Sequence, residues 1–187
     1  PILISHLKRI IEVISKVTQP NIKLKNKALI LIGFAGGFRR SELVSIQYED
    51  VEFVPEGVKI FVSRSKTDQS GEGMTKAIPY FENTSYCPVI SLKNWINHNQ
   101  IKDGAIFKMS DKNVSLIIKK YAKLAGLDPS KYSGHSLRSG FATTTAEFGA
   151  EERNIMAMTG HKSTQMVRRY IQESNLFKLN ALNKIKI

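Results

Sequence analysis

The sequence predicts a mainly helical α+β fold that contains a small antiparallel β-sheet or hairpin. Two observations lead to this prediction. Through most of the 187 residues, apolar side chains recur at the three- and four-residue spacing of amphipathic helices. Near the middle of the chain they alternate instead, on both sides of the polar, glycine-bearing segment KTDQSGEG. The length favours one domain with an ordinary hydrophobic core.

Helices are expected at the beginning of the chain, followed by two strands. The segment ILISHLKRIIEVISKV has helical spacing and stops before Pro20, and IKLKNKALILIGFAGG predicts a second, more buried helix. Ser41 and Glu42 open or continue a short helix through Ile46. The runs VKIFVSRS, residues 58–65, and MTKAIPY, residues 74–80, predict the two strands of a hairpin.

The remainder returns largely to helical spacing. After Pro88, VISLKNWINHN predicts a helix, AIF a short strand, and DKNVSLIIKKYAKLAG a helix with Asp111 as its N-cap and Gly126 at its end. Three short helices are expected in the last third: one from near His135 to about Gly149, one over EERNIMAM that ends at Gly160, and one that follows Ser163 through TQMVRRYI.

Charge and composition narrow the classes of function. Lys and Arg total 28 against 16 Asp and Glu, a formal net charge of +12 that predicts a polyanionic partner. The single Cys87 excludes an internal disulfide and a CxxC zinc site, and the four histidines lack HxxxH or HExxH spacing. No GxxxxGK[ST] loop is present. We therefore expect no metal and no cofactor.

No segment predicts a membrane span. Apolar runs such as ALILIGFAGGF are far shorter than the roughly 20 residues that cross a bilayer, and no signal peptide opens the chain. We expect a soluble, intracellular protein that does not bind membranes.

Two short motifs place arginines beside groups that could hold or activate a phosphate. In SGHSLRSG, His135 and Arg138 are three residues apart at the expected start of a helix, where unpaired backbone N–H groups could bind an anion. In GGFRRSEL, Arg39 and Glu42 are also three apart, so the carboxylate can brace a neighbouring cation. Arginines on two separate helices could each grip a phosphate bidentately.

Further along, TGHKS supplies His161, and VRRYI supplies Tyr170 nine residues later. Taken in order, Arg, Lys, HxxR, Gly-His and Tyr resemble the tyrosine recombinase (phage integrase) family, over essentially the whole chain from about Leu24. By this resemblance, the catalytic residues are Arg39, Lys66, His135, Arg138, His161 and Tyr170, with Glu42 in a supporting role.

The match leaves one assignment open and departs from the family at one position. The family carries a lysine on a β-hairpin between the first two motifs; Lys66 lies in the corresponding turn, and Lys76 on the second strand is a competitor. Ser139 stands where many members have a histidine. Counting from Gly37, Arg39 rather than Arg40 takes the catalytic place.

The resemblance implies a site-specific recombinase or integrase that cleaves DNA through a 3′-phosphotyrosyl intermediate without metal or ATP. Attack on a phosphodiester gathers negative charge on the non-bridging oxygens, which a cage of cations and donors stabilises. Tyr170 needs a base because a tyrosine hydroxyl, with an ordinary pKa near 10, is mostly protonated at neutral pH; His135 is expected in that role, and Lys66 as the acid. Two alternatives remain: a type IB topoisomerase and a catalytically silent DNA-binding module.

The expected partners are double-stranded DNA and further copies of the chain. The residues expected to bind DNA are Arg40, Arg64, Lys162, Arg168 and Arg169. The chain is expected to be a single catalytic domain, residues 1–187, that lacks an N-terminal DNA-binding domain. By the resemblance, the tail 173–187 would be exchanged between subunits of a tetramer on DNA. A cytoplasmic, nucleoid-associated protein of a bacterium or phage is implied.

Overall fold

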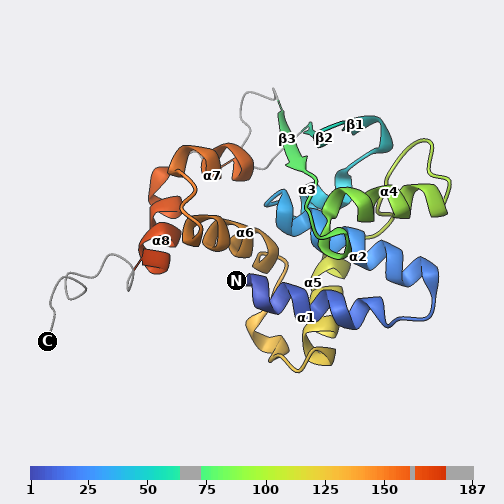
Figure 1. The fold of residues 1–187 in the computed structure, drawn as a ribbon, viewed down its shortest axis with the longest axis horizontal. Coiled ribbons are helices and arrows are strands. Elements are labelled where there is room, and N and C mark those ends of the chain that lie inside the picture. The colour runs from blue at the N-terminus through green and yellow to red at the C-terminus, as the bar shows by residue number, and fades with distance from the viewer. Residues whose placement is uncertain (64–72, 161–162, 176–187) are drawn as a thin grey trace, which may run out of the picture.

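The computed structural model describes residues 1–63, 73–160 and 163–175 (Figure 1). The predicted fold class is confirmed: within these residues there are eight α-helices and one small antiparallel sheet, which lies at the edge of the molecule. The helices are α1 (Ile4–Ser15), α2 (Pro20–Ala35), α3 (Arg40–Ser45), α4 (Pro88–His98), α5 (Asp111–Leu124), α6 (Ser136–Glu147), α7 (Glu152–Thr159) and α8 (Thr164–Asn175). Three single 3-10 turns lie at Tyr48–Asp50, Thr84–Tyr86 and Pro129–Lys131.

The sheet has three strands, one more than the predicted hairpin. Its strands are β1 (Val51–Val54), β2 (Gly57–Val62) and β3 (Met74–Pro79), in the order β1-β2-β3. The additional strand pairs with β2 from Val51 opposite Ile60 to Val54 opposite Gly57. The short turn at residues 55–56 makes this pairing possible, and the VEFV sequence of β1 alternates as strands do. The expected AIF strand is reduced to a single bridge between Gln47 and Ala105.

Helix α2 occupies the centre of the fold. Its residues from Ala28 to Phe34 are all buried, and it packs against α1, α4 and α6. A helical stretch that is apolar on every side, as residues 28–34 are, is stable only when other elements cover it, which agrees with the prediction of a buried second helix. Pro20 stands at its first turn, where the missing backbone N–H costs no hydrogen bond.

Helices α6, α7 and α8 form a smaller cluster, with α7 and α8 at one end of the molecule (Figure 1). Its core consists of Ala142, Ala146, Ile155 and Val167. Because α6 also packs on α2, this helix connects the small cluster to the main core. The arrangement brings the C-terminal third of the chain beside the turn that follows α2.

Of the predicted helix ends, the start of α5 was wrong, whereas the glycines that end α5 and α7 are confirmed. Helix α5 begins at Asp111 with Ser110 in the N-cap position, so the prediction of Asp111 as N-cap was wrong by one residue. Serine and aspartate are both favoured there, which makes the boundary ambiguous from sequence. Gly126 and Gly160 end α5 and α7 with φ of +69° and +64°, in the left-handed region that glycine adopts without strain.

The first residues of the chain pack along α6. Ile2 is completely buried, and its N–H donates a hydrogen bond of 2.9 Å to the carbonyl of Ser136. The approach requires Gly140, because a Cβ there would lie 2.1 Å from the carbonyl oxygen of Ile2. In the described part of the chain, no helix combines the length and apolar character needed to span a bilayer.

Candidate active site

The turn between α2 and α3 is built from Gly36, Gly37 and Phe38. Gly36 is the C-cap of α2, and Gly37 has φ of +55°. A Cβ at Gly37 would also lie 2.9 Å from the Phe141 ring. Phe38 is buried, so the turn is anchored in the core. These constraints bring the chain out of α2 so that Arg39 becomes the N-cap of α3.

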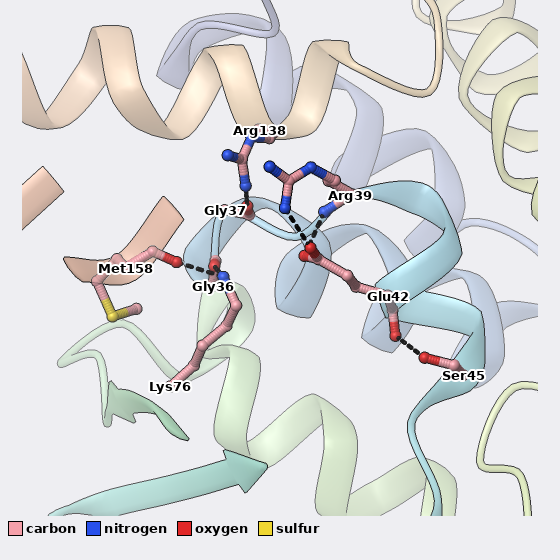
Figure 2. A network of polar contacts seen from close by, with 8 residues as sticks. All are labelled: Gly36, Gly37, Arg39, Glu42, Ser45, Lys76, Arg138 and Met158. Atoms are coloured by element: carbon pink, nitrogen blue, oxygen red, sulfur yellow. Dashed lines mark hydrogen bonds and ion pairs between the residues drawn. The ribbon is translucent and has the colours of Figure 1, made fainter. Parts of the chain in front are cut away.

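Arg39 is held by Glu42, one turn further along α3. The Arg39 Nη1 atom lies 2.5 Å from Glu42 Oε1, and the Arg39 backbone N–H donates to Glu42 Oε2 at 3.0 Å (Figure 2). The Glu42 side chain is 2% exposed and that of Arg39 17% exposed. A buried carboxylate with two such donors fixes the arginine in direction, as the sequence spacing predicted.

Arg138 reaches the same turn from α6. Its Nη1 donates to the carbonyl of Gly37 at 3.0 Å, and the residue is 6% exposed (Figure 2). The buried Nη2 has no hydrogen-bond partner among the described residues. Burial, followed by the positive charge of Arg39, lowers the pKa of Arg138 to about 10. A desolvated guanidinium with an unused donor is suited to bind an anion.

Lys76 enters this region from β3 on the opposite side of the turn. It is fully buried, and its Nζ donates to the carbonyl of Gly36 at 2.8 Å and to the carbonyl of Met158 (Figure 2). Burial is the main reason that the pKa of Lys76 falls to about 8. The sequence could have predicted this burial: in the strand MTKAIP, Lys76 lies two residues before the buried Ile78 and therefore on the same face.

The resulting cluster carries more positive than negative charge. Among the described contacts, three cations, Arg39, Lys76 and Arg138, interact electrostatically with one carboxylate, that of Glu42. A buried surplus of positive charge is unfavourable unless an anion compensates it. A phosphate group has the charge and the acceptor oxygens that this arrangement lacks.

Tyr170 lies on α8, next to this cluster. It is partly buried and packs against the small core of α6, α7 and α8. Its phenol lies close enough to Arg138 that an ionised Tyr170 would raise the pKa of that arginine. Arg138 and Tyr170 are therefore neighbours at the site, although they lie on different helices.

His135 is placed differently from Arg138, although they are only three positions apart in the sequence. It is the exposed N-cap residue of α6, and its N–H donates to Ser133 Oγ at 3.3 Å. Arg138 projects from the following turn into the buried cluster. Lys66 and His161 were also expected at the site, but both lie outside the described residues.

The residues expected to bind DNA lie on several elements. Arg40 pairs with Asp111 of α5, with Nε 3.0 Å from Oδ2. Arg168 of α8 lies 3.3 Å from Glu152 of α7, between Nε and Oε2. Both arginines keep exposed side chains, at 42% and 63%. Arg169 follows on α8, while Arg64 and Lys162 fall outside the described residues.

This helical domain places two arginines and a buried lysine in one cluster beside a tyrosine, a combination suited to chemistry on a phosphate ester. Residues 4–176 match the phage integrase family. The chain therefore belongs to this family, the tyrosine recombinases, which break and rejoin DNA, and the resemblance stated from the sequence is confirmed.

A curated relative supports the assignment, and two solved structures share the fold. The chain is 51% identical over 174 residues to an "Integrase/recombinase xerD homolog" of Selenomonas ruminantium, which covers 87% of this chain and 51% of the relative. The post-cleavage complex of the XerH recombinase with a palindromic difH substrate has a TM-score of 0.75 at 20% identity, over 93% of this chain and 50% of that one.

A lambda integrase dimer bound to a COC′ core site gives a TM-score of 0.61 at 19% identity, over 99% of this chain and 62% of that one. At these identities the two structures establish a common fold. The chain spans about half the length of the curated relatives that it matches.

Proposed function

We propose that this chain is the part of a site-specific recombinase that cleaves and rejoins DNA through a covalent bond to Tyr170. One observation carries the proposal: among the described residues, the cations Arg39, Lys76 and Arg138 outnumber the carboxylate of Glu42, and Arg138, near Tyr170, keeps a donor without a partner. A scissile phosphate supplies the missing negative charge and brings the phosphorus within reach of the phenol.

The reaction transfers a phosphoryl group from the 5′ oxygen of the DNA to the Tyr170 oxygen. The Tyr170 oxygen attacks the phosphorus, the new P–O bond forms, and the bond from phosphorus to the 5′ oxygen breaks. The phenolic proton passes to a base, for which we propose His135, and the leaving 5′ oxygen takes a proton from an acid, for which we propose Lys66. The products are a 3′-phosphotyrosyl link and a 5′ hydroxyl. Attack by another 5′ hydroxyl reverses the step without ATP.

The cations stabilise this step because negative charge develops on the non-bridging oxygens. Arg39 and Arg138 approach from two different helices, so each can hold a different oxygen. Glu42 keeps Arg39 in place, and we propose His161 as a further donor. Arg40, Arg64, Lys162, Arg168 and Arg169 would bind the flanking DNA backbone, whose contacts orient the duplex without reading its sequence.

Covalent trapping tests the proposal. Duplex DNA from the flanks of the gene is nicked beside the scissile phosphate, so that the released 5′-hydroxyl fragment diffuses away and the adduct accumulates. We expect a denaturant-resistant protein–DNA adduct whose yield EDTA does not change. Recombined junctions between two duplexes would then distinguish a recombinase from a topoisomerase, which reseals the same strand. DNA binding without an adduct on any flanking duplex would contradict the proposal and indicate a binding module.

We further propose that the chain assembles as a tetramer on two duplexes through its tail. Beyond α8, which ends at Asn175, the sequence continues with Leu176, Phe177, Leu179, Leu182 and Ile185. Their spacing in the sequence is that of an apolar stripe on a helix, and so short a helix would not be stable alone. A neighbouring subunit offers it a surface to cover.

Truncation after Asn175 therefore has a defined expected result. DNA binding by the truncated chain stays within a few-fold of the full chain, while higher-order complexes on DNA and recombined junctions are lost. Native gel shifts and junction yields measure the two effects. A full-length variant with serine at Leu176, Leu179 and Leu182 is the matched control and should behave like the truncation. Assembly and recombination unchanged in both would show that the tail is not an exchanged segment.

A further inference from the structure

Lys76 joins the ends of two helices that are distant in sequence. Its Nζ donates one hydrogen bond to the carbonyl of Gly36, the C-cap of α2, and another to the carbonyl of Met158, in the last turn of α7 (Figure 2). The last four carbonyls of a helix have no partner within that helix. The negative ends of two helix dipoles therefore meet at one ammonium group.

Each of these carbonyls lies three residues before a side chain assigned to the active site. Gly36 precedes Arg39, and Met158 precedes His161. The next carbonyl along, that of Gly37, accepts from Arg138. Two cations from two other elements thus hold consecutive carbonyls of the same glycine turn, and a shift of Lys76 displaces the turn that sets the position of Arg39.

We propose that Lys76 is a positioning residue, whose ammonium ties the ends of α2 and α7 together and so fixes Arg39 relative to the end of α7, which precedes His161 in the sequence. This inference rests on the proposed function for the roles of those two residues. It also assigns the two lysines of the hairpin region to different tasks, with Lys66 as the proton donor and Lys76 as the tie.

The surroundings of Lys76 disfavour proton transfer to DNA. The side chain is 0% exposed, two of its N–H groups are donated to carbonyls, and Nζ lies 4.7 Å from the centre of the Phe38 ring. A group that delivers a proton must come within hydrogen-bond reach of the leaving oxygen. Burial does lower the pKa of Lys76 to about 8, which is suitable for an acid, but the contacts direct the ammonium toward the protein interior.

The test compares Lys76→Met with Lys59→Met. Both replace a lysine of the sheet by a side chain of similar length, and Lys59 pairs in register with Ala77, next to Lys76. Lys59 is exposed and makes only a surface ion pair with Glu52, 3.6 Å away, among the described contacts. Hydrogen exchange is followed in peptides that cover residues 34–40 and 155–160. Single-turnover cleavage is measured at saturating DNA, with ordinary DNA and with DNA that has sulfur in place of the 5′-bridging oxygen.

The sulfur substrate separates positioning from proton donation. A thiolate leaves without protonation at neutral pH, because a thiol has a pKa near 8.5. This DNA therefore restores cleavage in a variant that lacks the general acid, but not in a variant whose catalytic residues are misaligned. For Lys76→Met we expect faster exchange in both peptides and cleavage about 100-fold slower on both substrates, with DNA affinity little changed. Lys59→Met should match the unmodified chain, and Lys66→Met should recover on the sulfur substrate.

Two results would overturn the inference: recovery of Lys76→Met on the sulfur substrate, or unchanged exchange and cleavage in that variant. If Lys76→Met does not fold, Lys76→Arg replaces it, since a guanidinium still donates to both carbonyls but is a poor acid. Cleavage retained on ordinary DNA then supports positioning, and cleavage restored only by sulfur contradicts it. If the unmodified chain forms no adduct, the proposed function fails, and the exchange data alone decide whether Lys76 ties the helices.

Discussion

Replacing Tyr170 by phenylalanine abolishes the covalent DNA adduct while DNA binding stays within about two-fold. The change removes one oxygen from a partly buried ring on α8 and leaves its packing against the small core of α6, α7 and α8 intact. Since the phenolic oxygen is the nucleophile, no P–O bond to the protein can form without it. Trapping on nicked duplexes measures the adduct, and gel shifts measure binding.

Tyr132→Phe provides a matched control. Tyr132 is buried and lies three residues before His135, and its hydroxyl is 3.1 Å from His6 Nδ1. The control loses a tyrosine hydroxyl close to α6 but should form the adduct at the rate of the unmodified chain. An adduct that persists in Tyr170→Phe would assign the nucleophile to another residue.

The sequence predicted the helices and strands of this fold better than the tertiary contacts between them. The apolar periodicity located the buried α2, and glycines marked the ends of α5 and α7, because these features act within a few residues. Strand β1 was missed because its four residues are too short to establish a period. Strand β1 is recognisable only from its pairing with β2, which is a tertiary contact that the sequence pattern does not show.

In the candidate site, too, contacts within one helix could be predicted from the sequence, whereas contacts between different elements could not. The spacing of Arg39 and Glu42 predicted their ion pair, because three residues on a helix form one turn. The proximity of Arg138 and Tyr170 could not be predicted from spacing, since they lie on different helices. Strand alternation could have shown that Lys76 faces inward with Ile78, but not that two helix ends meet there.

The two arginines of the site differ in what they contribute to stability. Arg39 neutralises the buried carboxylate of Glu42, whereas Arg138 donates to a neutral carbonyl and lies near another cation. The lowered pKa of Arg138 means that folding disfavours its charged form. The position is therefore suited to binding an anion, although it lowers the stability of the fold. Active-site residues commonly reduce stability in this way.

Arg138→Met should consequently lose cleavage without losing stability. We expect cleavage at saturating DNA to fall by about 10²- to 10³-fold, the effect of removing one preorganised donor to a developing oxyanion, while the Tm stays the same or rises. Arg39→Met should lose cleavage by a similar factor but also lower the free energy of unfolding by about 1–3 kcal/mol, because the buried Glu42 loses a donor. Single-turnover kinetics and thermal unfolding measure both quantities. Cleavage by Arg138→Met at the unmodified rate would remove Arg138 from the phosphate site, and a Tm several degrees lower would show that the guanidinium is a structural contact to Gly37.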